Sequence, residues 1–314
     1  MNDSSRRDFL KTCAMIGAAM KLGPFAQDAF AAPAGPVLCI AHYKKSPQTA
    51  DAIAEEARRL TQEAVNGVGG MGGMGRYISK GDVVWIKPNI GWNRRPEQAA
   101  TTNPDVVATL ASLCWEAGAK RVIVSDNSCN SAIASYAQSG IQQAAQKAGA
   151  ECFVMDERKF RKTSMGGKVM PAWELYGDVL GVNKFINVPI VKHHSLCKAT
   201  LGMKNLMGVA GGERSRFHQD LSNTLVDLAT FLRPTLVVMD AVRVLTANGP
   251  TGGNLADVQR RDTVAAGTDQ VAIDAFGATL LGLKPQDIGY IVEGDARKLG
   301  TMAFESLKPR RIEI

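Results

Sequence analysis

The chain has 314 residues, of which 45% are hydrophobic and 21% are charged, a composition typical of globular proteins that bury a sizeable core. Its formal net charge is +7, and aromatic residues make up only 6% of the chain. The basic residues are dispersed and are not interleaved with aromatics, which argues against a nucleic-acid-binding protein. A small anionic ligand is a better match for this charge, and a generally solvated surface is the best match.

The first 31 residues have the features of a signal peptide. Residues 6–11 read RRDFLK, which resembles the twin-arginine export motif, and a short apolar stretch then leads to the small-x-small sequence at 29–31. An amphipathic first helix with two arginines is the alternative interpretation. We expect a signal peptide over 1–31, export to the periplasm by the twin-arginine translocase, and a single domain over 32–314. That pathway carries folded proteins, which favours a bound cofactor, and no other segment is apolar enough to predict an integral membrane protein.

Apolar runs and helical stripes alternate along the rest of the chain. The runs predict strands at residues 36–41, 82–86, 121–125, 151–155, 185–191, 235–239 and 263–266. The stripes predict helices at residues 49–65, 103–118, 132–148, 221–232 and 269–281. The glycine run 66–75 predicts a surface loop, and residues 156–183 predict an excursion with a hairpin. This order predicts an α/β protein with a mostly parallel sheet, flanked by helices on both faces and built from βαβ units.

Several predicted strands end in polar side chains, at the sheet edge where open α/β proteins bind ligands. Lys87 and Asn89 follow the strand at 82–86, and Asn103 is placed to cap the next helix. Asp240 follows the strand at 235–239, as a catalytic or metal-binding carboxylate would.

Residues 184–218 hold most of the chemistry-bearing side chains. The apolar run 185–191, expected to be a buried strand, is followed directly by Lys192, His193 and His194. A glycine-rich loop comes after them. Three of the four histidines of the chain lie in this stretch. A buried strand that delivers His and Lys onto a glycine loop is a typical site position in an α/β protein.

Three interpretations of this stretch stay open. In the first, a histidine ligates a metal with Asp240 or Cys197, although adjacent histidines on a strand point to opposite faces. In the second, basic residues form an anion clamp, with a histidine as general acid or base, and the clamp residues are Lys192, Lys204, Arg214 and Arg216. In the third, the histidines are only hydrogen-bonded at a strand end. No CxxC spacing occurs among the six cysteines, so the chain has no iron–sulfur motif.

A series of motifs resembles the family called domain of unknown function 362. In chain order the motifs are DVVWIKPNI, TNPDVV, INVPIVKHH, ATLGMKNLMG, MDAV…NGPTGG and TDQVAIDAFGATLLG. The family's motif positions fall on Lys87, Asn89, Asn103, Lys192, His194, Thr200, Lys204, Asn205 and Asp240. The family usually has Lys-Thr-His where this chain has residues 192–194, which favours His194 over His193. Many members carry ferredoxin-type cysteine motifs and are regarded as redox proteins, whereas this chain carries none.

The layout also resembles the N-terminal part of the lactate racemase family, which uses a nickel-pincer nucleotide attached to a lysine. The shared features are a crossover helix, a histidine near a strand end and a lysine flanked by glycines. None of these features specifies that cofactor.

These observations predict a crevice that binds an anionic ligand or cofactor. We expect His194, Lys204 and Asp240 to be catalytic and His194 and His218 to be candidate metal ligands. The expected ligand- or cofactor-binding residues are Lys87, Asn89, Asn103, Lys192, Thr200, Asn205 and Arg214. A metal ion or a metal-containing cofactor is compatible with this set.

The expected activity is that of a cofactor- or metal-dependent oxidoreductase, or of a racemase-like proton-transfer enzyme. The alternative is a non-catalytic periplasmic binding protein or an accessory protein for cofactor maturation.

Overall fold

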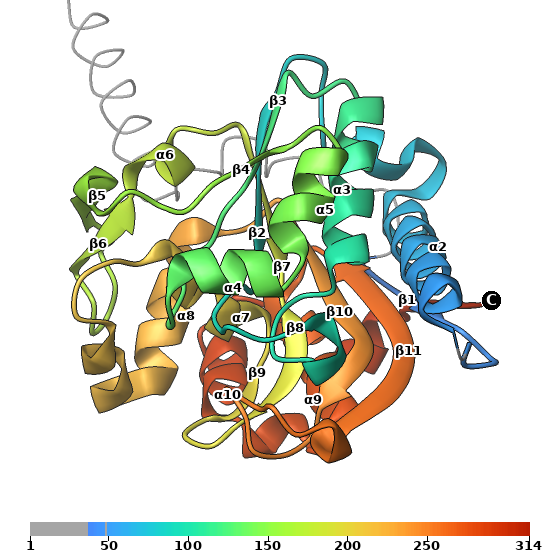
Figure 1. Cartoon of the computed structure of the whole chain (residues 1–314). Helices are drawn as coiled ribbons and strands as arrows, with labels where there is room; N and C mark the ends of the chain where they lie inside the picture. The colour runs from blue at the N-terminus through green and yellow to red at the C-terminus, as the bar shows by residue number, and fades with distance from the viewer. Residues whose placement is uncertain (1–36, 48) are drawn as a thin grey trace, which may run out of the picture.

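The computed structural model of the protein describes residues 37–47 and 49–314. The predicted signal peptide and the start of the first predicted strand lie outside these residues. The described residues are built around one large sheet, and helices cover both of its faces (Figure 1). The α/β class predicted from the sequence is therefore confirmed.

The large sheet has ten strands and is mostly parallel. Its main path runs in the order β12-β1-β11-β10-β7-β2-β3-β4, while β8 pairs with β10 and with β9. Six strand pairings are parallel and three are antiparallel. The strands are β1 (Leu38–His42), β2 (Val83–Pro88), β3 (Arg121–Val124), β4 (Glu151–Cys152), β7 (Lys184–Val188), β8 (Ile190–His194), β9 (Lys198–Thr200), β10 (Leu236–Leu245), β11 (Val258–Gly267) and β12 (Arg310–Glu313). A separate hairpin pairs β5 (Phe160–Ser164) with β6 (Ala172–Tyr176), where the sequence predicts one.

Side chains that alternate along the strands build an apolar core on each face of the sheet. In β2, Trp85 packs into one core, whereas Val84 and Ile86 pack into the other. Helices α8, α9 and α10 cover the Trp85 side, and α2, α3 and α5 cover the opposite side. The helices are α2 (Ala50–Gly69), α3 (Pro104–Glu116), α4 (Ala132–Gln138), α5 (Ile141–Lys147), α6 (Gly177–Leu180), α7 (Gly202–Asn205), α8 (Leu221–Leu232), α9 (Gln270–Leu280) and α10 (Gly289–Ala296).

Helices join parallel neighbours, as βαβ units require. Helix α3 connects β2 to β3, and α4 and α5 connect β3 to β4. The N-terminus of α3 is as predicted, because Asn103 Oδ1 accepts the N–H of Asp105 at 2.9 Å and Pro104 takes the first helical position. The carboxyl ends of β2 and β3 therefore lie side by side, and the segments that follow them meet at one edge of the sheet.

Several predicted elements differ from the observed ones. The apolar run 185–191 is divided at Pro189 into β7 and β8, because proline has no N–H for a strand ladder. The predicted helix 132–148 is divided at Gly140, whose φ is +70°. The strand predicted at 235–239 continues to Leu245, so that Asp240 lies inside β10 and not at its carboxyl end.

The glycine run 66–75 is helical, and the prediction of a loop is wrong there. Helix α2 continues to Gly69, and the 3₁₀ helix Gly70–Arg76 follows it. Val68 and Met74 are buried in the core on that face, which holds the run against the sheet. Gly67 permits a close approach because it has no side chain to place between the helix and strands β1 and β12.

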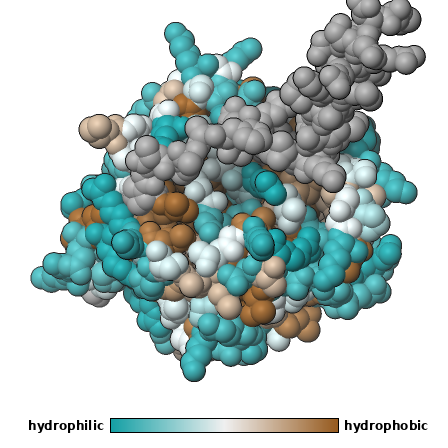
Figure 2. Space-filling view, turned by 180° about the vertical axis from the view of Figure 1, so that it is seen from behind, coloured by the Kyte–Doolittle hydropathy of each residue, from teal (hydrophilic) through white to brown (hydrophobic). Residues whose placement is uncertain are grey.

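The face opposite to the view of Figure 1 is mostly hydrophilic and carries separate apolar patches (Figure 2). No helix in the described part of the chain is both long enough and apolar enough to cross a bilayer.

Gly67 tests how tightly α2 packs on the sheet. A Cβ atom at this position would lie 2.2 Å from Cys39 Sγ and 3.1 Å from Ile312 Cδ1. We expect Gly67→Ala to lower the free energy of unfolding by about 1–3 kcal/mol in urea titrations, because overpacking displaces the strand. The matched control is Gly75→Ala, where a Cβ would meet open space. Equal stability of the two variants would contradict the close packing.

Candidate functional site

A cavity of about 430 Å³ opens at the carboxyl edge of the sheet. Its walls come from the segments after β2 and β3, from β8 and β9, and from the chain between α7 and the 3₁₀ helix Arg214–Asp220. Nine predicted site residues line it, namely Lys87, Asn89, Lys192, His194, Thr200, Lys204, Asn205, Arg214 and His218. The structure therefore brings together side chains that are up to 131 positions apart in the sequence, from Lys87 to His218.

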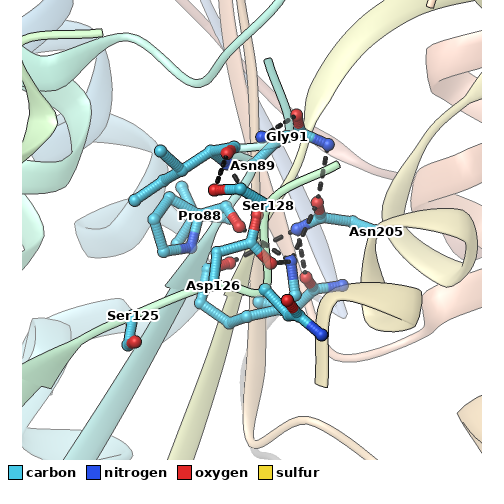
Figure 3. A network of polar contacts seen from close by, with 12 residues as sticks. Pro88, Asn89, Gly91, Ser125, Asp126, Ser128 and Asn205 are labelled. Atoms are coloured by element: carbon cyan, nitrogen blue, oxygen red, sulfur yellow. Dashed lines mark hydrogen bonds and ion pairs between the residues drawn. The ribbon is translucent and has the colours of Figure 1, made fainter. Parts of the chain in front are cut away.

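Lys87 forms an ion pair with Asp126, which is labelled in the polar network of Figure 3 together with Asn89 and Asn205. Lys87 Nζ is 2.6 Å from Asp126 Oδ1 and also donates to the carbonyl of Pro88 (2.8 Å) and to Asn205 Oδ1 (3.2 Å). Asp126 Oδ2 accepts the N–H of Ile90 at 2.6 Å. Burial lowers the pKa of Lys87, and the Asp126 carboxylate opposes that shift. The pair joins the end of β2 to the segment that follows β3.

Two asparagine side chains connect this pair to a second buried lysine. Asn205 Oδ1 accepts from Lys87 Nζ and from Asn89 Nδ2 (3.0 Å). Asn89 Oδ1 accepts from Lys192 Nζ at 3.2 Å, and Lys192 Nζ also donates to the carbonyl of Ala100 at 2.6 Å. Burial lowers the pKa of Lys192 to about 7. Lys192 therefore has only neutral acceptors for its ammonium group.

Gly208 forms a wall of the cavity directly against the ion pair. A Cβ atom there would lie 1.7 Å from Asp126 Oδ1 and 2.6 Å from Lys87 Nζ. The Gly208 carbonyl accepts the N–H of Asn127 at 2.9 Å, which ties the loop to the segment after β3. Only glycine allows the backbone to approach this closely.

Lys204 lines the cavity, and its ammonium group has only a weak hydrogen-bond acceptor among the described residues. Its Nζ donates to Met207 Sδ at 3.0 Å, and a thioether is a weak acceptor. Burial lowers the pKa of Lys204, and the nearby charge of Arg214 acts in the same direction. The amine at this position is therefore more readily deprotonated than an ordinary lysine.

Arg214 adds a further positive charge to the cavity lining. Its guanidinium donates to the carbonyls of Asn127 and Ser128, both at 2.8 Å, and so also positions the loop after β3. Arg216, the other arginine of the predicted clamp, instead lies over the ring of Trp173 and does not line the cavity.

His194 faces the cavity as a neutral imidazole. The residue is 6% exposed, and its Nδ1 accepts the N–H of Leu196 at 3.2 Å, so the ring proton is on Nε2. Burial lowers the pKa of His194 to about 3, and the charges of Lys204 and Lys192 act in the same direction. In this state His194 is a hydrogen-bond donor to the cavity.

The neighbouring histidines have different surroundings. His193 Nδ1 accepts the N–H of Gly249 at 3.1 Å, and its ring does not line the cavity, as expected for adjacent strand residues. His218 lines the outer part of the cavity and is exposed. No group of three or more His, Cys, Asp and Glu side chains within residues 37–47 and 49–314 is placed to hold a metal ion. The lysines and asparagines suit an anionic group better than a bare metal ion.

Asn103 and Asp240 lie away from the cavity lining. Asp240 Oδ2 accepts the N–H of Asn103 at 2.8 Å, and Oδ1 accepts the N–H of Val242 at 3.0 Å. Burial raises the pKa of Asp240 to about 6. These contacts give Asp240 a structural role, which fastens the start of α3 to the central strand β10.

Other lining residues were not selected from the sequence, notably Asp126, Cys129 and Trp92. Asp126 follows the strand predicted at 121–125, the same signal that singles out Lys87. Cys129 is an exposed free thiol, and Trp92 lies in the loop after β2. Nothing in the sequence around these two residues distinguishes them from ordinary loop residues.

Comparisons with known proteins give a family and two similar proteins. The family described as "Domain of unknown function (DUF362)" matches residues 84–279. The thylakoid-associated protein sll1697 of Synechocystis sp. is 28% identical over 250 residues, which cover 75% of this chain and 74% of that protein. The lactate racemase apoprotein of Thermoanaerobacterium thermosaccharolyticum is similar in structure over 77% of this chain and 56% of its own, with 10% identity and a TM-score of 0.48. The chain thus spans little more than half of that racemase.

The protonation of His194 gives a testable pH dependence. The folded state keeps this ring neutral down to about pH 3, whereas the unfolded chain binds a proton near the ordinary pKa of 6.5. Below pH 6.5 the unfolded state therefore binds more protons, and His194 lowers the free energy of unfolding by up to about 1.4 kcal/mol per pH unit.

Urea unfolding of wild type and His194→Gln at pH 7 and pH 5 measures this effect. The wild type should lose more stability than the variant on going to pH 5, because buried carboxyl groups contribute equally to both. Equal losses in the two proteins would contradict a buried neutral His194. Ring ¹⁵N shifts, assigned with His193→Gln, should show His194 still neutral at pH 5.

Proposed function

The chain belongs to the domain of unknown function 362 family, and we propose that its cavity binds a small anionic substrate and transfers a proton on it. The charge of the cavity carries this proposal. Among the described residues that line it, Asp126 is the one carboxylate, and it is paired with Lys87. The positive charges of Lys192, Lys204 and Arg214 have no carboxylate to balance them in the cavity. A carboxylate or phosphate would supply the missing charge.

His194 is the proposed group for proton transfer. A neutral imidazole with its proton on Nε2 donates a hydrogen bond to an oxygen that gains negative charge, as in an enolate. Lys204 supplies an amine of lowered pKa beside it. Binding of an anion opposes the part of the pKa shift of His194 that the charges of Lys204 and Lys192 cause, and so raises this pKa.

The same cationic groups would hold an anionic cofactor. Lys192, Lys204 and Arg214 suit the phosphate groups of a nucleotide-type cofactor, which would supply the electrophilic or redox chemistry of an oxidoreductase. The side chains in the cavity favour proton transfer over redox chemistry, because the imidazole of His194 and the amine of Lys204 can both bind and release a proton. Any metal would then enter as part of the cofactor, with the donor set of this chain holding its anionic groups.

The second candidate function is a non-catalytic binding or cofactor-maturation protein. The same unbalanced charge supports it, since binding needs the lysines but not His194. The two candidates differ in what a change at His194 does. An enzyme loses turnover and keeps its affinity for the ligand, whereas a carrier has no turnover and keeps its affinity.

We also propose that the protein is exported to the periplasm by the twin-arginine translocase. The motif RRDFLK at residues 6–11 and the small-x-small sequence at 29–31 support this.

Proton exchange on anionic substrates tests the proposed function. In D₂O, wild-type protein should exchange the C3 protons of one or more short 2-oxo acids, observed by ¹H NMR. His194→Gln should reduce the exchange rate by about 100-fold or more and change the dissociation constant by less than about threefold. Glutamine is chosen because its side-chain oxygen can accept the Leu196 N–H in place of Nδ1. Lys198→Gln, a change of an exposed lysine outside the cavity, is the matched control.

The outcomes separate the candidates. Binding without exchange by the wild type would support the carrier, and no binding of oxo acids or inorganic phosphate would contradict both functions.

Export is tested by replacing Arg6 and Arg7 with lysines in the full chain. The twin-arginine translocase requires the arginine pair, so we expect the protein to shift from the periplasmic to the cytoplasmic fraction of a host with this pathway. A Lys11→Arg change serves as the charge-matched control. Unchanged export of the double variant would contradict this route.

A further inference from the structure

The three lysines of the cavity differ in what holds their nitrogen atoms. Lys87 Nζ is paired with a carboxylate and has two further oxygen acceptors within 3.2 Å. Lys192 Nζ donates to the Ala100 carbonyl at 2.6 Å and to Asn89 Oδ1 at 3.2 Å. Both side chains are at most 1% exposed. Their contacts fix both nitrogen atoms in the wall of the cavity.

Lys204 is placed differently. It is partly exposed to the cavity, and the described structure gives its Nζ a single hydrogen-bond partner, the sulfur of Met207 at 3.0 Å. Loss of that weak bond costs little, so the nitrogen is free to move onto a ligand. Burial lowers the pKa of this amine, which increases the uncharged fraction that can act as a nucleophile.

The groups around Lys204 match a carbonyl compound that also carries an anionic group. Arg214 and Lys192 line the same cavity and provide positive charge for a carboxylate. His194 provides a donor, Nε2–H, for an oxygen that becomes negative during attack on a carbonyl. Lys204 and His194 line this cavity together, and the charge of Lys204 acts with burial to lower the pKa of His194.

We propose that Lys204 forms an imine with a short 2-oxo acid. The Nζ lone pair adds to the C2 carbonyl carbon, the C=O π bond breaks, and the oxygen, with a hydrogen bond from His194, becomes the hydroxyl of a carbinolamine. The C–O bond then breaks, the C=N bond forms, and the oxygen leaves as water with the two protons that the amine has lost. The step needs no oxidant or reductant. The imine makes the C3 protons more acidic, so this proposal extends the proposed function and rests on it.

Reductive trapping tests the imine. Full-length protein is incubated with pyruvate and sodium cyanoborohydride, digested and analysed by mass spectrometry. We expect a mass increase on Lys204 equal to pyruvic acid minus one oxygen atom, saturating with pyruvate concentration. Lys204→Arg keeps a positive charge, so it should still bind pyruvate, yet show no label at this position. Lys198→Gln should label at Lys204 like the wild type.

The outcomes distinguish this proposal from the proposed function. Pyruvate binding and C3 exchange without a label on Lys204 would overturn the imine and leave Lys204 as a base. Labelling spread over exposed lysines, without saturation, would also overturn it. If the wild type binds no oxo acid or phosphate, the proposed function itself fails. A melting temperature of Lys204→Arg close to that of wild type shows that loss of label is not loss of fold.

Discussion

The site depends on the burial of Lys87 at the end of β2. An ammonium group without water is destabilised by several kcal/mol unless a partner charge and hydrogen bonds compensate it, and removal of one partner of such a pair typically costs about 3–5 kcal/mol. Asp126, Asn205 and the carbonyl of Pro88 supply this compensation. These partners come from three segments that are distant in the sequence. Their correct placement around one nitrogen atom therefore fixes the relative positions of β2, the segment after β3 and α7.

Among the lysines that line the cavity, only Lys87 has a partner carboxylate that compensates for its burial. Lys192 has neutral oxygen acceptors and Lys204 has a thioether, and neither has a partner carboxylate. Burial lowers the pKa of both amines. A protein that only needed a stable core would gain by replacing them with apolar side chains. The unbalanced charge has an explanation if an anion enters the cavity, because the anion then stabilises the charged lysines and couples its binding to proton uptake.

Much of the fold follows from local sequence patterns. The apolar runs, the Asn103 cap and the alternation of strands and helices predict the class, the βαβ units and the edge of the sheet that holds the cavity. Local sequence patterns do not predict the end of a strand where pairing with a distant strand determines it. Asp240 looks like a strand end in the sequence, yet β10 continues because β11 pairs with it as far as Leu245.

The candidate site shows the same division. Nine of the predicted residues line the cavity because each follows a strand or belongs to the glycine-rich stretch. The sequence cannot show that Asp126 pairs with Lys87, 39 positions earlier, or that Gly208 must be glycine to fit against that pair. It also cannot show which lysine lacks an oxygen acceptor. That difference comes from the carbonyl of Ala100 and the amide of Asn89, which reach Lys192 and not Lys204.

A crystal structure of the protein soaked in sodium bromide tests the central claim, that the cavity carries positive charge without a balancing anion. Bromide is a small anion that anomalous scattering locates without ambiguity. The account predicts an ordered bromide in the cavity, in contact with Lys204 Nζ and close to Arg214 and Lys192, at lower concentration than surface sites. Bromide bound only on the outer surface, with water alone in the cavity, would contradict it.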